Sequence, residues 1–227
     1  MTEVVVDISS RRIVSAYVAA PFDKGKEALA FLGYEIISLA DNAKLRIQEG
    51  VKANVSRKGN WVREGVIYVP NKGIFLTKKS PIMAHAGKAT DCHRNREDYF
   101  LTKEQVEEAL SDSVELNANP IPTDRFGDNG ITVYAFGDVA KKYGSFLREA
   151  GISKMPLWLA DIQDKSFVRQ MWFGCLDFSS MLGGDWVLCY DDDWVRGLRD
   201  LQKISETYIK DLGFSKIKRS LLNKLKQ

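Results

Sequence analysis

The chain has 227 residues, of which 44% are hydrophobic and 28% charged, and its formal net charge is +3. This balance is typical of a soluble globular protein with a single domain over 1–227, and its three cysteines exclude a dense disulfide framework. No apolar run is long enough to span a membrane and the first residues lack a signal-peptide pattern, so we expect a cytoplasmic or virion-associated protein.

The first third of the chain predicts two strands, a helical region and a hairpin. Residues 2–9 are rich in valine and predict a first strand, and residues 13–20 predict a second short strand or its continuation. Apolar residues recur at helical spacing over 24–49, and Gly33 marks a candidate break into two helices. Two apolar runs on either side of a Pro-Asn-Lys-Gly turn predict a hairpin over 65–77.

Both histidines of the chain, His85 and His93, lie in one short stretch with Cys92. These residue types bind zinc, but their spacing matches no zinc pattern and a fourth ligand would have to come from elsewhere. We therefore predict no metal site. An enzyme or zinc protein that uses these three residues remains the alternative.

The middle of the chain predicts a capped helix and a loop. Thr102 and Gln105 have the spacing of a capping box, which opens a helix over 103–110. Residues 117–128, with two prolines, predict a loop.

Residues 130–160 have the pattern of a strand, a helix and a second strand. We expect a strand over 131–136, a helix that begins at Asp138, and a strand over 155–160. No glycine-rich phosphate loop joins the first strand to the helix, so the pattern does not indicate a nucleotide site.

The end of the chain, 201–227, predicts a helical tail. Its basic part, 216–227, offers an alternative function in nucleic-acid binding. Terminal helices of this kind more often pack an apolar stripe and leave their lysines in water, so we expect no nucleic-acid partner.

The stretch 171–201 differs in composition from the rest of the chain. It contains no Lys, Glu or Gln, although these types form about a sixth of the sequence and roughly five would be expected here. All its acids are Asp, and three of the five tryptophans of the chain, Trp172, Trp186 and Trp194, stand among short residues. Rigid aromatic rings among short polar residues are typical of a binding surface. The alternative is a turn-rich stretch packed near the core.

Catalytic patterns are missing from the same stretch. Asp191, Asp192 and Asp193 are adjacent and predict a loop, and the twelve-residue calcium pattern with its final Glu is not present. Cys175 and Cys189 have no neighbouring His and no C-x-x-C partner, so they are either small buried fillers, thiol nucleophiles or a disulfide pair. We predict a protein that is not an enzyme and needs no cofactor.

Three segments of this region carry a family resemblance: RQMWF at 169–173, LGGxWxL at 182–188 and VRGL at 195–198. They resemble the variable region of proteins diversified by diversity-generating retroelements of the archaeal or archaeal-virus type. In that family a reverse transcriptase miscopies adenines, so codons such as AAC come to encode many residues but never Lys, Glu or Gln. The resemblance implies an α+β, C-type-lectin-like fold with a small antiparallel sheet flanked by helices.

We therefore predict a non-catalytic, receptor-type protein whose variable region, 171–196, binds an unidentified ligand, which we expect to be a protein surface. Four apolar residues alternate with exposed short residues and would face inward on a strand or turn of period two: Leu176, Leu182, Trp186 and Leu188. The residues predicted to bind the ligand are Gly174, Cys175, Asp177, Phe178, Ser179, Asp185, Val187, Cys189, Tyr190, Asp191, Asp192 and Asp193.

Overall fold

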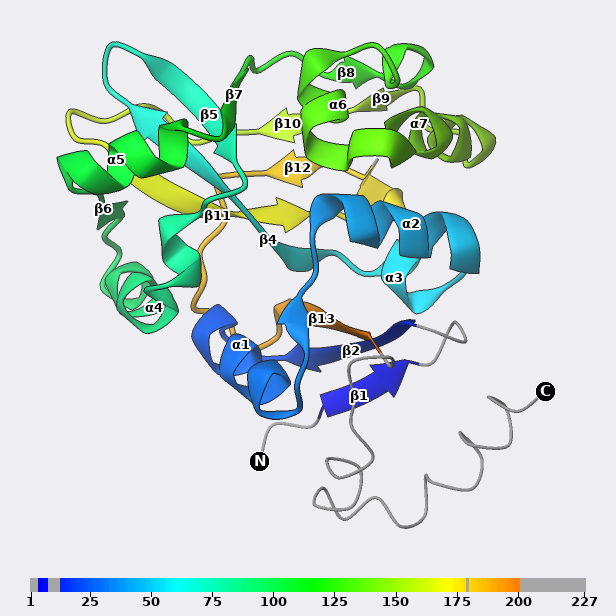
Figure 1. Cartoon of the computed structure of the whole chain (residues 1–227), viewed down its shortest axis with the longest axis horizontal. Helices are drawn as coiled ribbons and strands as arrows, with labels where there is room; N and C mark the ends of the chain where they lie inside the picture. The colour runs from blue at the N-terminus through cyan, green and yellow to red at the C-terminus, as the bar shows by residue number, and fades with distance from the viewer. Residues whose placement is uncertain (1–3, 8–12, 179, 201–227) are drawn as a thin grey trace.

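The computed structural model describes residues 4–7, 13–178 and 180–200 (Figure 1). Its strands are β1 (Val4–Asp7), β2 (Ile13–Ala19), β3 (Glu35–Ile36), β4 (Asn60–Val69), β5 (Gly73–Thr77), β6 (Tyr99–Phe100), β7 (Ser113–Leu116), β8 (Ile121–Pro122), β9 (Lys154–Met155), β10 (Leu157–Trp158), β11 (Phe167–Phe173), β12 (Leu182–Gly183) and β13 (Trp194–Asp200). Its helices are α1 (Phe22–Phe31), α2 (Leu39–Glu49), α3 (Asn54–Arg57), α4 (Ala86–Arg94), α5 (Lys103–Leu110), α6 (Gly130–Phe136) and α7 (Ala140–Glu149), with short 3-10 turns η1 (Pro81–Met83), η2 (Thr123–Arg125), η3 (Gly137–Val139) and η4 (Leu176–Phe178).

The first part of the chain forms the elements that its sequence predicts. β1 and β2 pair antiparallel, and β4 and β5 form the expected hairpin. The helical region divides into α1 and α2 at Gly33, whose positive φ of 76° few other residues adopt. The capping box also forms: Thr102 accepts from the backbone N–H of Gln105, and the Gln105 side chain accepts from the N–H of Thr102.

Residues 130–136 are a helix, α6, and the predicted strand there is wrong. The Asn129 side chain caps this helix, because its oxygen accepts from the backbone N–H groups of Ile131 and Thr132. Ile131 and Ala135 are buried four residues apart, which is the spacing of one helical face. The expected strand–helix–strand crossover therefore does not exist, and α7 begins at Ala140 after the η3 turn.

The main sheet runs in the order β1-β2-β13-β4-β11-β12-β10, with β3, β5, β6 and β7 joined at its sides. β4 is central: Trp61 pairs with Trp172 of β11 on one side and with Val195 of β13 on the other. The end of β11 and the start of β13 therefore meet at one end of β4. The segment that joins them, 174–193, must lie at this end of the sheet.

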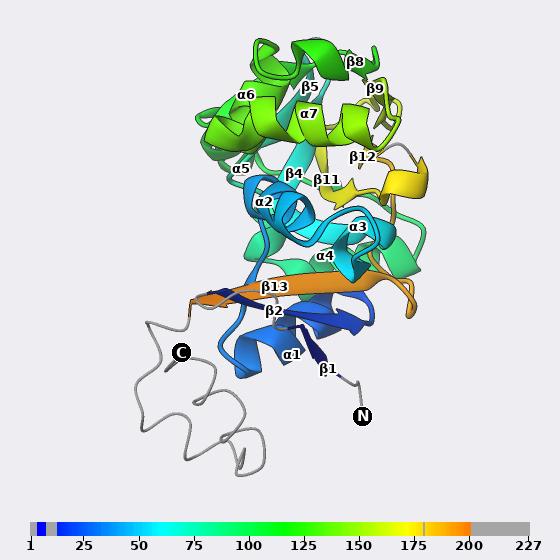
Figure 2. The same cartoon turned by 90° about the vertical axis from the view of Figure 1, so that its right-hand side faces the viewer.

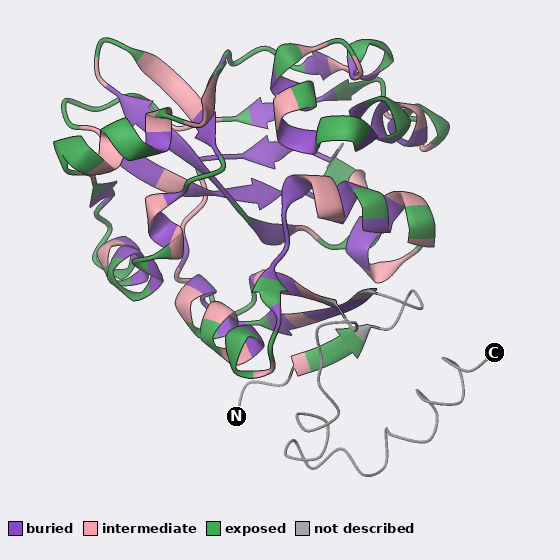
Figure 3. Cartoon of the chain, viewed as in Figure 1, coloured by how far each residue is buried: buried purple, intermediate pink, exposed green. Residues whose placement is uncertain are grey.

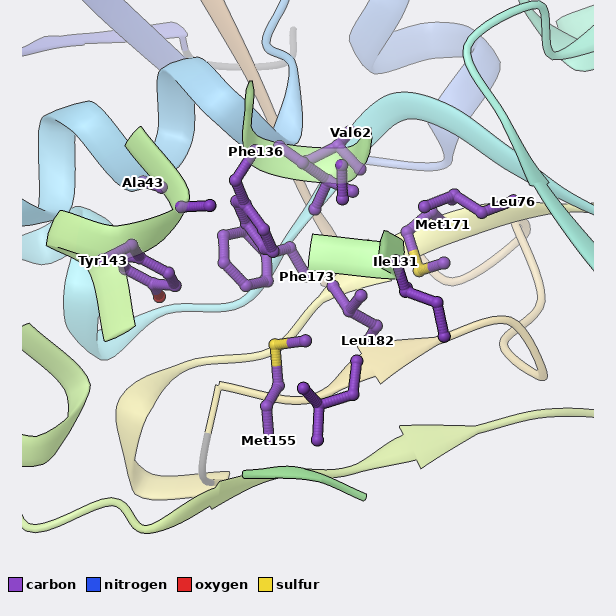
Figure 4. Close-up of a cluster of buried hydrophobic side chains, with 14 of the residues drawn as sticks. Ala43, Val62, Leu76, Ile131, Phe136, Tyr143, Met155, Met171, Phe173 and Leu182 are labelled. Atoms are coloured by element: carbon purple, nitrogen blue, oxygen red, sulfur yellow. The ribbon is translucent and has the colours of Figure 1, made fainter. Parts of the chain in front are cut away.

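Hydrophobic cores cover both faces of the central strands, which are buried almost throughout (Figure 3). Neighbouring residues of β4 point to opposite faces, so Val62 packs under α2, α6 and α7, while Trp61 packs on the side of α1 and α4. Figure 2 shows α6 and α7 at one end of the molecule and α1 at the other. Figure 4 shows Phe136, Phe173 and Leu182 among the side chains of the first core.

Among the described residues, no helix is both long and apolar enough to cross a bilayer. The predicted helical tail, 201–227, and the basic element within it lie outside the described residues.

Candidate functional site

The segment 174–193 carries the residues predicted to bind the ligand, and it is mostly irregular. It contains only η4 and the two-residue strand β12, with turns elsewhere. The expected alternation of a period-two segment is therefore wrong as a description of its backbone. Instead, hydrogen bonds from other parts of the chain determine its path.

Arg46 of α2 holds the beginning of the segment. Its buried guanidinium donates to the carbonyl oxygen of Gly174 at 2.9 Å and to the Ser180 hydroxyl at 3.0 Å. It also stacks on the Phe173 ring, 3.9 Å from the centroid. The Tyr143 hydroxyl of α7 lies 2.6 Å from Ser180 Oγ, so two helices fix this turn.

Residues from β4 and β10, and the residue that follows β2, hold the later part of the segment. The backbone N–H of Gly184 donates to the carbonyl of Trp158, and the Tyr68 hydroxyl donates to the carbonyl of Gly184 at 2.8 Å. At the far end, the N–H of Ala20 donates to the carbonyl of Asp193 at 2.9 Å. The backbone is thus tied to the rest of the fold at intervals, and these bonds do not depend on the outward side chains of the segment.

His93 is one of these backbone anchors. Its Nδ1 accepts from the N–H of Leu188 at 2.9 Å, and burial lowers the pKa of His93 to about 4, so the ring is neutral at physiological pH. His85 is exposed and Cys92 is half-buried. Within the part of the chain that the structure describes, no three His, Cys, Asp or Glu side chains are grouped to hold a metal ion. This geometry gives the zinc alternative no support.

The side chains predicted to bind the ligand differ in exposure. Val187 and Cys189 are half-buried, and Ser179 lies outside the described residues. Leu182 and Leu188 are buried, and Trp186 is half-buried. Six predicted residues are exposed: Asp177, Phe178, Asp185, Tyr190, Asp191 and Asp192.

Three other predicted residues, Gly174, Cys175 and Asp193, are buried, contrary to the expected exposure. Gly174 packs against Met181 so closely that a Cβ atom would lie 2.6 Å from its Cγ. Cys175 lies in the turn that Arg46 holds, and its carbonyl accepts from the N–H of Ser180. Cys175 and Cys189 are both free thiols, so the alternative of a disulfide pair is wrong.

A pocket of about 500 Å³ opens beside the segment, and its wall is largely aromatic. The rings of Trp172 and Trp186 stack with their centroids 5.2 Å apart. Trp158 and Phe178 are 43% and 62% exposed, so large apolar surface remains open to a ligand. The aromatic residues that line the pocket are Trp158, Trp172, Phe178, Trp186 and Trp194.

Charged side chains of both signs also line the pocket. The acids come from the segment itself, whereas Arg57 and Lys58 come from the region after α2. The Lys58 ammonium lies 5.2 Å from the ring centroid of Trp194. Sequence patterns gave no signal for Arg57, Lys58 or Trp158, because only the fold brings them to the segment. The acids that line the pocket are Asp177, Asp192 and Asp193.

Asp193 is the buried acid of this pocket, with only 7% of its surface exposed. Burial and, to a lesser extent, the neighbouring Asp192 carboxylate raise the pKa of Asp193 to about 7, although a hydrogen bond from the Trp61 indole opposes the rise. Asp193 Oδ2 and Trp61 Nε1 are both buried from solvent, so the indole N–H is the donor placed beside this carboxyl.

A solved structure from Nanoarchaeota, described as accommodating massive sequence variation by the C-type lectin fold, is similar to this chain. The similarity covers 86% of this chain and 100% of that chain, with a TM-score of 0.63 and 11% sequence identity. No protein-family model matches the chain, and no curated protein matches it. The protein therefore has the α+β C-type lectin fold that the sequence resemblance implies.

Proposed function

We propose that this protein is a non-catalytic, receptor-type binding protein whose region 171–196 presents a changeable surface to a protein ligand. The proposal rests on one observation about 174–193: its backbone and its exposed side chains have different roles. Distant parts of the fold hold its backbone, while six of its side chains point to solvent. Exchange of those six side chains would change the surface without removing the bonds that fix the backbone.

The composition of the region supports diversification by a retroelement. Adenine-directed changes in AAC-type codons cannot produce Lys, Glu or Gln, and the stretch 171–201 contains none of them. A C-type lectin fold with its irregular segment at the end of the sheet also suits this use, because the core lies behind the segment. The Nanoarchaeota protein with the same fold is described as accommodating massive sequence variation.

The surface suits a protein ligand better than a small apolar molecule. Exposed Phe178, Tyr190 and Trp158 give broad aromatic contact area, and the exposed aspartates surround it with polar groups. Aromatic residues within a polar surround are typical of protein–protein interfaces.

Sequencing of the DNA around the gene tests the diversification directly. We expect a nearby near-copy of the DNA that encodes 171–196, differing from it mainly where the copy has adenine, beside a gene for a reverse transcriptase. If neither is found, diversification is wrong. A C-type lectin fold with an aromatic, acidic pocket would then remain.

A further inference from the structure

Most tryptophans of the chain gather around the pocket beside the segment 174–193. The chain has five tryptophans, and four of them line this pocket. The fifth, Trp61, is fully buried and packs edge-on against Trp172, with the ring centroids 5.1 Å apart. We call the four residues that line the pocket the tryptophan wall: Trp158, Trp172, Trp186 and Trp194.

Two glycines let the central rings of the tryptophan wall pack tightly. A Cβ atom on Gly59 would lie 2.6 Å from Cζ2 of Trp172, and one on Gly183 would lie 2.8 Å from Cδ1 of Trp186. The two rings stack at an interplanar angle of 15°, with their centroids 5.2 Å apart. Tight packing holds both rings in position before a ligand binds, so binding costs little conformational entropy at this wall.

Part of this aromatic surface is open to a ligand. Trp158 is 43% exposed, and Trp186 and Trp194 are half-buried. Apolar surface of this kind gains free energy when another apolar group covers it. An aromatic ring gains more than its area alone predicts, because offset and edge-to-face ring pairs attract each other. The pocket volume of about 500 Å³ is within the usual range for ligand pockets, so an aromatic side chain fits.

The charges at the pocket do not favour a charged occupant. The exposed cations Arg57 and Lys58 equal in number the exposed acids Asp177 and Asp192. Asp193 also lines the pocket, but its Oδ2 is buried from solvent and is not open to a ligand. A neutral aromatic side chain therefore suits the pocket better than an ion does.

Diversification of the kind proposed above would leave the tryptophan wall unchanged. Trp158 lies outside 171–196, and the other three tryptophans lie within it. The Trp codon, TGG, contains no adenine, so a reverse transcriptase that miscopies adenines copies it faithfully. The residues that both line the pocket and belong to the six exposed positions are Asp177, Phe178 and Asp192.

We propose that the tryptophan wall is a constant anchor site, which takes a neutral aromatic side chain of the protein ligand in every variant of this protein. The exposed residues at the edge of the pocket then select among ligands that share this anchor. The inference rests on the proposed function, since it names the part of the ligand that the constant surface recognises.

Nuclear magnetic resonance on the full chain tests the proposal through the five tryptophan indole N–H signals. The probes are N-acetyl-phenylalanine methylamide and N-acetyl-cyclohexylalanine methylamide, whose side chains are similar in shape but differ in aromaticity. We expect the phenylalanine probe to bind about fivefold more tightly, although the cyclohexyl ring is the more hydrophobic. The largest shifts should fall on the tryptophan wall, and the buried Trp61 should shift least. Equal or weaker binding of the phenylalanine probe would overturn the proposal.

Matched variants locate the interaction. Trp158→Ala removes a partly exposed ring of the tryptophan wall and keeps the backbone carbonyl that accepts from Gly184, so it should weaken binding of the phenylalanine probe about fivefold. Tyr190→Ala removes an exposed ring that does not line the pocket, so it should change binding by less than about twofold. Equal effects of the two variants would show that the probe does not bind at the wall. The comparison of probes on the unaltered chain decides the matter even if Trp158→Ala does not fold.

A triple variant separates the constant site from its replaceable edge. It combines Asp177→Ser, Phe178→Ser and Asp192→Ser, and serine is a residue that AAC-type codons can come to encode. The preference for the phenylalanine probe should stay within about twofold of its value in the unaltered chain. Loss of that preference would mean that the site changes with the exposed residues, contrary to the proposal.

The outcomes also distinguish this inference from the proposed function. Absence of an aromatic preference beside an intact template copy would overturn this inference alone. An aromatic preference without a template copy would overturn the diversification and leave the aromatic site.

Discussion

Arg46 shows how one buried residue can support a surface that others form. It reaches from α2 to Gly174 and Ser180, so the turn at the start of the segment depends on a helix more than a hundred residues away. Arg46→Met should lower the free energy of unfolding by about 3 to 5 kcal/mol, because it leaves buried acceptors without donors. Urea denaturation followed by circular dichroism measures this.

Arg125→Met is the control for that variant, because Arg125 is an exposed arginine of η2. It should change the free energy of unfolding by no more than about 0.5 kcal/mol. Equal effects of the two variants would mean that Arg46 does not support the segment.

Asp193 gives a prediction for the pH dependence of stability. Burial raises the pKa of its carboxyl to about 7 in the folded protein, above its ordinary value of 3.8. The unfolded chain releases this proton at lower pH than the folded chain, so the group stabilises the fold below about pH 4 and loses that contribution as pH rises to about 7. Asp193→Asn cannot lose this contribution, because its amide does not ionise. The free energy of unfolding of Asp193→Asn relative to the unaltered chain should therefore rise by about 2 to 4 kcal/mol between about pH 4 and pH 8.

Denaturant unfolding at several pH values measures that gain. Asp191→Asn serves as the control, because Asp191 is exposed in the same turn. A stability difference between Asp193→Asn and the unaltered chain that stays constant with pH would contradict the assignment of the buried carboxyl.

At the scale of the element, the segment 174–193 should tolerate substitution of its exposed side chains but not of its buried ones. Leu188 is fully buried, and replacement by Ala should cost about 2 to 5 kcal/mol of stability. Asp191 is exposed, and replacement by Ser should cost no more than about 0.5 kcal/mol. Thermal unfolding of the two variants compares them, and similar losses would show that the segment is not a fixed backbone with replaceable side chains.

Local sequence signals predicted some elements correctly, and they failed where contacts with distant residues determine the secondary structure. The capping box at Thr102 and Gln105 placed α5 correctly, because both partners lie within one turn. We predicted a strand over 131–136 from its β-branched and aromatic residues, and that prediction was wrong. In the folded protein, the cap from Asn129 and the burial of one helical face favour a helix. β-Propensity is a weak guide where capping and packing favour a helix.

The same limit applies to the site. Composition indicated the stretch that carries it, and the inward direction of Leu182 and Leu188 followed from their apolar character. Burial of Asp193 could not be predicted, since its turn is held by Ala20, far away in the sequence. Arg57 and Lys58 reach the pocket only through the fold, so no pattern within 171–196 could reveal them.

At the scale of the whole molecule, the topology agrees with the proposal that the surface changes without loss of the fold. β11 and β13 flank β4 and meet it at Trp61, so the segment between them begins and ends on a fixed platform. Two hydrophobic cores lie behind that platform, under α2, α6 and α7 on one face and beside α1 and α4 on the other. The exposed side chains of the segment contribute to neither core.

Sequencing this gene from many cells of its source population tests the central claim most directly. We predict that differences between copies fall within the codons for 171–196 and concentrate at the exposed positions, while the codons for Trp172, Leu182, Trp186 and Leu188 stay constant. The exposed positions are Asp177, Phe178, Asp185, Tyr190, Asp191 and Asp192. Differences spread along the whole gene in proportion to its length would contradict the account.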